Sequence, residues 1–409
     1  MTRPIVITGY EQLSSLGNTI DELDASLQIL RSGVSAYSLH LAGIDPAQVA
    51  ISQVNWDDSQ ITAPSKVPMD RGTAMALHVA KGAMAHASVN SDELEPTRLG
   101  VYWGSGMAGA HTFDTSSESL YAQHRRLRPT NVVTIMPNAP AAEIALQFKA
   151  QGACLTFACA CASSAVAIGE AMHALRSGRL DVAIVGGSES MLTPGVIASW
   201  QAMRVLAPAA DHAQAACRPF DKHRKGFALG EGAGALVIET LDHARLRGAQ
   251  PLAMLSGFGL SSDGRHITNP DVGGQIRAMQ HALDDAQLQA SAIDYINAHA
   301  TATQAGDAAE AQSVCSVFGE YAVPISSTKA LHGHLLGASG VVELIISLRS
   351  FVTQQLPRAA HLEALDPAFK LRVVTDDVSQ PSSGPRHVMS NSFAFGGTNA
   401  VLIASRFQD

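Results

Sequence analysis

The amino-acid sequence predicts an α/β fold with layered sheets, because strand-like and helix-like stretches alternate in both halves of the chain. Near-continuous apolar runs at 181–187 and 232–239 are typical of strands buried on both faces of a sheet. With 409 residues, 46% hydrophobic and 16% charged, the chain can form two packed domains or one large duplicated one. Each half is expected to carry about five strands, which suggests a duplication.

The elements of the first half are expected in a simple order. A strand at 5–9 ends at a glycine, and the apolar spacing at 19–30 predicts a helix that stops near Gly33. The stretch 38–68 is polar and interrupted by prolines, so we expect an irregular surface excursion there. The remaining elements are helices at 74–87, 141–149 and 241–247, strands at 99–104, 181–187 and 232–239, and a strand-to-helix unit at 154–169.

A boundary between the halves is expected near residue 250, because the helix at 241–247 ends at Gly248 and Pro251 follows. We therefore predict an N-terminal half at 1–250 and a C-terminal half at 251–409. The second half is expected to contain helices at 275–286, 307–318 and 339–351, and strands at 253–259, 295–298, 323–326, 372–374, 387–391 and 400–404.

Composition argues against several classes of protein. A net charge of −8 disfavours general nucleic-acid or membrane-surface binding, since both need a basic field. The uncharged stretch 151–169 holds too many polar and small residues for a membrane span. Five unevenly spaced cysteines disfavour a disulfide framework or a structural zinc site, and the N-terminus lacks the apolar core of a signal peptide. A reducing cytoplasm fits these observations best.

Cys161 is the candidate nucleophile. It lies where a short strand-like run that begins at Cys154 turns into small residues and then into a helical pattern through Leu175. Backbone N–H groups and the helix dipole favour a thiolate at such a turn. The simpler alternative is a structural thiol, since most free cysteines behave as small buried hydrophobic residues. Cys159 would lie on the opposite face from Cys161 if the segment were extended.

Four other patches carry residues suited to chemistry, at 104–107, 295–307, 326–337 and 391–399. Each also has an ordinary interpretation, as a common GSG triplet, a surface histidine, a solvated basic cluster or a glycine turn. The sequence contains no glycine motif of the nucleotide-binding types. A candidate thiolate together with two histidines, a lysine and a flexible glycine loop makes up the parts of acyl-thioester chemistry.

At these motifs the sequence resembles the β-ketoacyl-acyl carrier protein synthases of the KAS I/II type, which are elongating members of the thiolase superfamily. The matching motifs are ACASS around Cys161, NAHATAT around His299, SSTKALHGHLLGASG around Lys329 and His334, RPFDKHRKGFALGEGAGALV at 218–237, and NSFAFGGTNA at 391–400. They span nearly the whole chain in the family's order. The resemblance implies a thiolase-like fold, in which two similar βαβαβαββ halves form five layers, α-β-α-β-α.

The resemblance also implies an enzyme, a 3-oxoacyl-[acyl-carrier-protein] synthase that needs no metal or organic cofactor. Cys161 would accept an acyl group, and the backbone N–H groups of Cys161 and Phe395 would form an oxyanion hole. His299 and His334 would stabilise the enolate that forms when a malonyl thioester loses CO₂. Attack of this carbanion on the acyl-cysteine would give a β-ketoacyl product.

Other residues of the motifs have supporting roles by resemblance. Lys329 would order the site through hydrogen bonds, with Glu343 as its partner. Thr301 and Thr303 would bind the phosphopantetheine arm of the carrier protein. The other matching positions are Phe393, which would help to bind the malonyl group, Phe395, which would act as a gate, and Met107 and Trp200, which would line the acyl pocket.

Acyl carrier protein, in its acyl and malonyl forms, is the expected partner, and no nucleic acid or membrane is. The family resemblance also implies a dimer, either of identical chains or with a related subunit. An acidic enzyme that binds an acidic carrier protein needs local basic charge. The candidates for such a surface are Arg125, Arg126, Arg128, Arg204, Lys222, Arg224 and Lys225.

The sequence departs from the family pattern at Ala300, Ala302 and Ala394, where glycine is usual, and at His332. Alanine removes access to positive φ and stiffens a loop, so we expect altered gating at Ala394. The departures suggest a specialised synthase, for polyenes or another secondary product such as a polyketide, as an alternative to the housekeeping enzyme of fatty acid biosynthesis. The main alternative is a non-catalytic subunit of the chain-length-factor type, which the retained Cys161 disfavours. A degradative thiolase would need a second catalytic cysteine near the C-terminus, and a starter-type synthase would carry Asn in place of one histidine.

Overall fold

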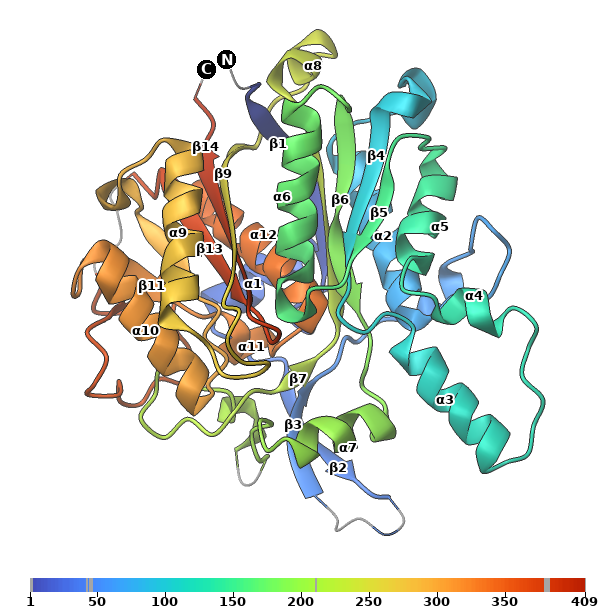
Figure 1. Cartoon of the computed structure of the whole chain (residues 1–409), viewed down its shortest axis with the longest axis horizontal. Coiled ribbons are helices and arrows are strands. Elements are labelled where there is room, and N and C mark those ends of the chain that lie inside the picture. Colours follow the sequence, from blue (N-terminus) through green and yellow to red (C-terminus); the bar gives the residue numbers. More distant parts are fainter. Residues whose placement is uncertain (1–2, 42, 44–46, 210–211, 379–382, 409) are drawn as a thin grey trace.

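The computed structural model describes residues 3–41, 43, 47–209, 212–378 and 383–408. Its N-terminal half forms a five-stranded half sheet (Figure 1). The strand at 232–240 runs antiparallel to both of its neighbours, and the strands beyond it run parallel to one another. In spatial order the strands are β1 (Ile5–Leu13), β8 (Gly232–Thr240), β6 (Val182–Glu189), β4 (Leu99–Gly104) and β5 (Cys154–Phe157).

The C-terminal half repeats this arrangement and adds one strand at the edge. Its strands in spatial order are β9 (Ala253–Ser262), β14 (Thr398–Arg406), β13 (His387–Phe393), β10 (Tyr295–Asn297), β11 (Pro324–Ser326) and β12 (Arg372–Val373). Strand β14 runs antiparallel to its neighbours, as β8 does in the first half. Pairing of β1 with β9 at residues 5–7 joins both half sheets into one sheet of 11 strands.

Helices α6 (Ser163–Arg176) and α12 (Ser339–Thr353) form the central layer between the half sheets (Figure 1). One core cluster contains side chains of both helices and of β1, β8, β9 and β14. Helix α6 lies close to β9 because it carries small residues. A Cβ atom at Gly169 would overlap the ring of Phe258 on β9.

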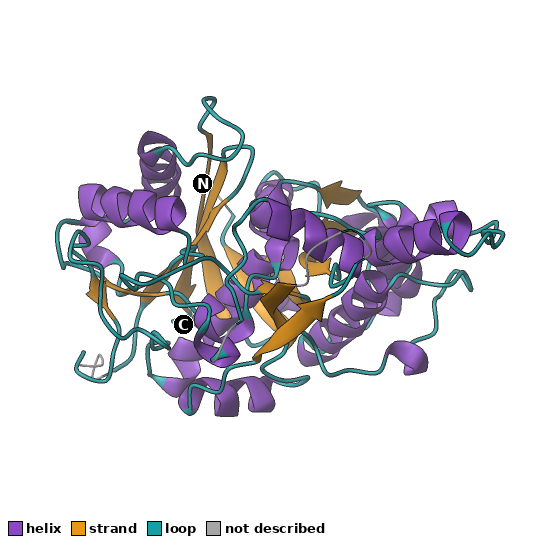
Figure 2. Cartoon of the chain, turned by 90° about the horizontal axis from the view of Figure 1, so that it is seen from below, coloured by secondary structure: helices purple, strands orange, loops and turns teal. Residues whose placement is uncertain are grey.

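Two outer layers complete the five-layered architecture that the resemblance implies. Helices α2 (Arg71–His86) and α5 (Ala139–Phe148) cover the outer face of the first half sheet, and α9 (Val272–Ala286) and α10 (Gln304–Phe318) cover that of the second. Figure 2 shows helices on either side of the central strands. The other helices near the core are α1 (Ile20–Gln28), α8 (Leu241–Leu246) and α11 (Lys329–His332).

The prediction of an irregular excursion at 38–68 is wrong at 38–39 and 47–52, whereas 53–68 contains only loops and a short 3₁₀ turn. This stretch contains β3 (Ala47–Ser52) and the end of β2 (Val34–Leu39), which pair with each other and, through β3, with β7 (Leu229–Gly230). Both strands mix small and polar residues, so they lack a clear apolar alternation. Three helices were also not expected, namely α3 (Ala110–Tyr121), α4 (Asn131–Ile135) and α7 (Pro194–Ala202).

Among the described residues, the stretch 336–353 is long and apolar enough to cross a membrane, and 78% of it is buried inside the protein. It consists mainly of α12, which packs on both half sheets, so its apolar character belongs to a core helix. The uncharged stretch 151–169 instead contains β5 and the beginning of α6.

Candidate active site

Cys161 lies in a 3₁₀ turn at Ala160–Ala162, between β5 and the N-terminus of α6. The Oγ atom of Ser163 fixes this turn, because it donates to the carbonyl of Ala160 at 2.7 Å and accepts from the N–H of Cys159 at 2.9 Å. Ala160 has a φ of +46°, which non-glycine residues rarely adopt. The two cysteines are therefore not on opposite faces of an extended strand.

His334 faces the thiol, with Nε2 at 3.0 Å from Sγ of Cys161. Its Nδ1 atom lies 3.0 Å from Oγ of Ser339, which orients the ring. The backbone is also fixed, since the N–H of His334 donates to the carbonyl of Ala228 at 2.7 Å and its carbonyl accepts from the N–H of Gly230 at 2.9 Å. His334 follows the short helix α11, two residues after that helix ends.

His299 follows β10, and its ring centroid lies 5.4 Å from that of His334. Glu310 accepts from the N–H groups of His299 at 3.0 Å and Ala300 at 2.7 Å, so its carboxylate fixes the backbone at the histidine. The potential ligand atoms of Cys161, His299 and His334 all lie within 4.8 Å of one another. Such a Cys-His-His set could hold a soft divalent cation such as Zn²⁺.

Lys329 and Glu343 form an ion pair in which both side chains are fully buried. Burial raises the pKa of Glu343 to about 7, and the Lys329 ammonium opposes this rise. Burial and the charge of Lys329 hold the pKa values of His299 and His334 well below the usual range. Both imidazoles are therefore neutral at pH 7, the state in which they can accept a proton or donate one N–H.

Burial raises the pKa of the Cys161 thiol to about 12, although the Lys329 ammonium and the backbone N–H groups of Phe395 and Cys161 oppose this rise. The N-terminus of α6 adds a dipole that favours the thiolate. The resting pair is a thiol beside a neutral imidazole, so ionisation requires a nearby proton acceptor. The two N–H groups that we expect in the oxyanion hole are thus the ones that favour the ionised form of Sγ.

A cavity of about 260 Å³ opens beside these side chains and brings most of the predicted site together. Its wall includes the predicted residues Cys161, Trp200, His299, Thr301, Thr303, His334, Phe393 and Phe395. Met107 does not line this cavity. It lies on a neighbouring groove of about 630 Å³, and Trp200 and Met203 line both spaces.

Aromatic rings border the reacting side chains. Phe395 stacks on Trp200 with ring centroids 6.2 Å apart, and the ring of Phe393 meets that of His299 at 6.3 Å. The two glycines after Phe395 have φ values of +87° and +78°, which favour glycine over other residues. The loop that we expect to act as a gate therefore depends on its glycines.

Thr301 and Thr303 place their hydroxyl oxygens 3.1 Å apart at the cavity, and Thr303 also caps α10. Between them, Ala302 has a φ of +63°. The expectation that alanine would exclude a positive φ is thus wrong at this position. A hydrogen bond from the N–H of Gly226 to the carbonyl of Ala302, at 2.8 Å, helps to hold the strained residue.

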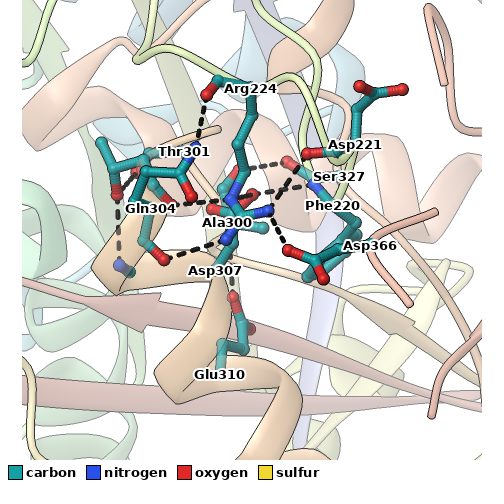
Figure 3. A network of polar contacts seen from close by, with 12 residues as sticks. Phe220, Asp221, Arg224, Ala300, Thr301, Gln304, Asp307, Glu310, Ser327 and Asp366 are labelled. Carbon is teal, nitrogen blue, oxygen red and sulfur yellow. Dashed lines mark hydrogen bonds and ion pairs between the residues drawn. The ribbon is translucent and has the colours of Figure 1, made fainter. Parts of the chain in front are cut away.

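We expected Arg224 to belong to a basic docking surface. This prediction is wrong, because only 3% of Arg224 is exposed. It donates to the carbonyls of Thr303 at 3.2 Å and Gln304 at 3.1 Å and to Asp366 at 2.8 Å (Figure 3). Its guanidinium lies 4.8 Å from the ring centroid of Phe369. Arg224 therefore holds the loop that carries Thr303 at the cavity. A run of basic residues in a sequence does not reveal which of its members is buried.

Sequence reasoning missed two buried carboxylates, Asp307 and Glu310, on α10 (Figure 3). Asp307 accepts from the N–H of Phe220 at 2.8 Å and lies 3.7 Å from Arg224, and burial raises its pKa to about 7. Glu310 accepts from Asn391 at 2.9 Å as well as from the backbone at the histidine. Their spacing of three places them on one helical face, directly after the NAHATAT motif, and this signal could have found them.

Two family descriptions match the chain that carries this geometry. Residues 2–244 match the family described as "Beta-ketoacyl synthase, N-terminal domain", and residues 252–363 match "Beta-ketoacyl synthase, C-terminal domain". A buried cysteine beside two histidines, within two similar half sheets, is the arrangement of a thiolase-like condensing enzyme. The chain belongs to the β-ketoacyl synthase family.

Relatives over the full length agree with this assignment. The chain is 36% identical over 417 residues to "3-oxoacyl-[acyl-carrier-protein] synthase 2" of Staphylococcus aureus (strain COL), covering 99% of this chain and 98% of the relative. It is 36% identical over 409 residues to "Nodulation protein E" of Rhizobium leguminosarum bv. trifolii, covering 98% and 99%. The solved structure "The ishigamide ketosynthase/chain length factor" superposes with a TM-score of 0.89, at 28% identity and over 100% of both chains. The predicted family and fold are confirmed.

Proposed function

We propose that this protein catalyses a decarboxylative Claisen condensation between an acyl group on Cys161 and malonyl-acyl carrier protein. The product is a 3-oxoacyl-acyl carrier protein for fatty acid synthesis or for a specialised polyene or polyketide pathway. The observation that carries the proposal is the buried set of Cys161, His299 and His334 on one cavity, under the charge of Lys329. The name of the S. aureus relative supports the substrate class.

The first half-reaction acylates Cys161. Its Sγ attacks the carbonyl of an acyl thioester, and the thiol proton moves to Nε2 of His334, 3.0 Å away. The N–H groups of Cys161 and Phe395 stabilise the oxyanion of the tetrahedral intermediate. The carrier-protein thiolate leaves and takes up the proton from His334.

The second half-reaction forms the carbon–carbon bond. The bond between the malonyl carboxylate and the Cα atom breaks, CO₂ leaves, and the electron pair of that bond forms an enolate with the thioester. The enolate oxygen accepts hydrogen bonds from His299 and His334. The carbanion attacks the acyl carbonyl, the bond to Sγ of Cys161 breaks, and the thiolate takes a proton from solvent. The Ser339 hydroxyl can donate to or accept from Nδ1 of His334, so it supports both the acceptor and the donor form of that ring.

Binding roles complete the proposal. Thr301 and Thr303 hold the phosphopantetheine arm, because their hydroxyls face the cavity. Phe393 helps to bind the malonyl group, and Phe395 gates access to the thiol. Trp200 and Met107 line the acyl site, which requires that the chain pass from the cavity toward the groove that shares Trp200.

The test is to incubate the protein with a panel of acyl-acyl carrier proteins and malonyl-acyl carrier protein and to determine the products by intact mass. We expect acylated Cys161 and a product two carbons longer than the acyl substrate. Elongation of ordinary saturated substrates at typical housekeeping rates would eliminate the specialised pathway. Absence of any condensation product, with a folded protein and acylated carrier, would contradict the proposed reaction.

A chain-length-factor-type subunit without chemistry is the second candidate, because one solved relative, "The ishigamide ketosynthase/chain length factor", pairs a ketosynthase with such a factor. The oriented Cys161–His334 pair disfavours it, since a non-catalytic subunit has no need of a buried thiol facing an imidazole. Labelling with a thiol-reactive fatty-acid mimic separates the two roles. Modification of Cys161 supports the enzyme, and an unmodified, folded protein supports the partner role.

An apolar face supports the proposed dimer. Its exposed residues lie on α3, α4, α5 and the edge strand β5 and just after α7, and they are Phe113, Tyr121, Val132, Val133, Leu146, Leu155 and Met203. Several exposed apolar side chains on elements near an open strand edge are typical of an interface. We propose that a second copy of this chain covers it, with a related subunit as the alternative. A solution mass of one chain by light scattering would contradict this.

Carrier-protein docking is proposed at the exposed basic residues Arg125, Arg126, Arg128, Arg204, Lys222 and Lys225. Charge reversal at Arg126 should raise KM for the acyl-acyl carrier protein without changing KM for a pantetheine thioester. The proposed setting is the cytoplasm, where the five free cysteines would remain reduced.

A further inference from the structure

Glu189 is a buried carboxylate at the end of β6, with only 1% of the residue exposed. It accepts from the N–H groups of Gly106 at 2.6 Å, Met107 at 3.0 Å and Gly337 at 3.1 Å, and from the hydroxyl of Ser105 at 3.1 Å. These donors come from two separate turns. The first is the GSGM patch at 104–107, to which the proposed reaction assigns only an acyl-lining role at Met107.

Both turns lie against the catalytic machinery. A Cβ atom at Gly106 would lie 3.5 Å from the carbonyl oxygen of Ala160, the residue before the nucleophile. Gly337 lies in the 3₁₀ turn Leu336–Ala338, which separates His334 from its partner Ser339. Leu336 has a φ of +43° and lines the cavity. The Glu189 carboxylate thus accepts hydrogen bonds from the turn beside Cys161 and from the turn beside His334.

The turns approach each other too closely for side chains. A Cβ atom at Gly337 would lie 2.7 Å from Oε2 of Glu189, and one at Gly187 would lie 2.8 Å from the carbonyl oxygens of Gly104 and Gly337. Because no side chain fits at Gly337 where the turns meet, a central acceptor is needed to hold their N–H groups. A carboxylate offers two oxygens with about four acceptor positions, which fits four donors.

We propose that Glu189 is a positioning residue that ties the Gly106–Met107 turn to the Gly337 turn and thereby sets the places of Cys161, His334 and the acyl-lining Met107. The assignment rests on the proposed function, since it concerns acyl transfer to the same thiol. Displacement of a nucleophile by about 1 Å can cost about 100-fold in rate, so loss of this tie should slow acylation strongly.

Two variants separate the reach of the side chain from its charge. Glu189→Gln keeps the length but brings an NH₂ group against N–H donors, and Glu189→Asp keeps the charge but is too short to reach both turns. We expect the rate of acyl transfer to Cys161 to fall about 10- to 100-fold in both variants, with an altered product-length distribution. Ser105→Ala removes a single donor and should show a smaller loss in the same direction, which keeps the test open if either Glu189 variant fails to fold.

Alkylation of Cys161 by iodoacetamide as a function of pH provides a readout that a general loss of structure would not reproduce. The Glu189 charge raises the pKa of the thiol, and Lys329 lowers it, while His299 and His334 face the same thiol and stay unchanged in every variant. Glu189→Gln should therefore shift the alkylation profile to lower pH although acyl transfer becomes slower. Glu189→Asp should leave the profile in place.

The matched control is Glu239→Gln, another buried carboxylate of the first half sheet, which bonds to Thr8, His243 and Arg247 away from the cavity. It should lower thermal stability without changing acyl transfer or the alkylation profile. Unchanged acyl transfer in folded Glu189→Gln and Glu189→Asp would overturn the positioning role. If the wild-type protein itself forms no acyl-enzyme, the proposed function fails instead, and the alkylation profiles alone decide the role of Glu189.

Discussion

At the scale of the residue, Lys329 acts on all three reacting side chains in a consistent direction. Its ammonium lowers the pKa of the Cys161 thiol and also the pKa values of His299 and His334. A positive charge favours a thiolate and keeps both imidazoles neutral as N–H donors for the enolate, and it opposes the imidazolium that forms while His334 holds the thiol proton. Its ion pair with Glu343 keeps it in place inside the protein.

The Lys329→Met variant tests this electrostatic role. The alkylation profile of Cys161 should move to higher pH, because the charge that lowers the thiol pKa is gone. Malonyl decarboxylation should fall by about 100-fold or more, since enolate stabilisation loses its supporting charge. Lys149→Met, at an exposed ion pair with Asp92, is the control and should change neither measurement. An alkylation profile at the wild-type position would contradict the role given to Lys329.

Ala302 offers a test of backbone strain. Ala302→Gly should change the free energy of unfolding by less than about 0.5 kcal/mol, because relief of the positive φ of +63° offsets the added flexibility of the unfolded chain. Ala308→Gly, at an exposed position inside α10, should cost about 1 kcal/mol. Chemical denaturation measures both. Equal losses at the two positions would show that Ala302 carries no strain.

At the scale of the element, α6 connects the nucleophile to the packing of the two halves. Its small face lets it lie close to β9, where Gly169 meets the ring of Phe258, while its N-terminus carries the turn with Cys161. A shift of this helix would therefore move the thiol relative to His334, which α11 and α12 position from the other half of the chain.

Gly169→Ala should destabilise the protein by about 1–3 kcal/mol, because the added methyl group overlaps Phe258 and forces α6 away from β9. Acyl transfer should fall at the same time. The double variant Gly169→Ala/Phe258→Leu removes part of the ring and should recover part of both losses. Additive destabilisation, measured by chemical denaturation in a double-mutant cycle, would contradict direct contact as the cause.

At the scale of the whole molecule, the sequence predicts what local patterns encode and misses what only the assembled fold decides. The apolar run that ends in glycine places β4 at 99–104, with the same bounds in the structure. The mixed pattern of β2 and β3 hides them, because their pairing depends on contacts that the local sequence does not encode: β2 pairs with β3, and β3 also pairs with the distant strand β7. Motifs identify Cys161 and His334, yet the 3.0 Å between Sγ and Nε2 depends on how the two halves of the chain pack. The burial of Arg224 depends in the same way on the loop at Thr303, which is distant in sequence.

The acid stability of the whole molecule should depend on Glu239, which joins β8 to β1 through Thr8 and to α8 through His243. Despite its burial, hydrogen bonds from His243, Arg247 and Thr8 lower the pKa of Glu239 to about 2 from an ordinary value of 4.5. A carboxyl group with a lowered pKa stabilises the folded state fully above 4.5, and this contribution is lost as pH falls toward 2. The shift corresponds to about 3 kcal/mol.

Buried carboxyl groups with raised pKa values act in the opposite sense. For Glu189, Glu343 and Asp307, with pKa values of about 7, the folded state gains from the protonated form at low pH and loses this gain as pH rises toward 7. The gain from Glu189 and Glu343 is complete below about pH 4.5 and that from Asp307 below about pH 3.8, so the acid limb of stability below pH 3.8 should isolate Glu239 from these three groups. The free energy of unfolding, measured by denaturation from pH 2 to 6, should show a limb that Glu239→Gln flattens by about 3 kcal/mol. The exposed Glu320→Gln control should leave it unchanged, and a wild-type limb in Glu239→Gln would contradict the assignment.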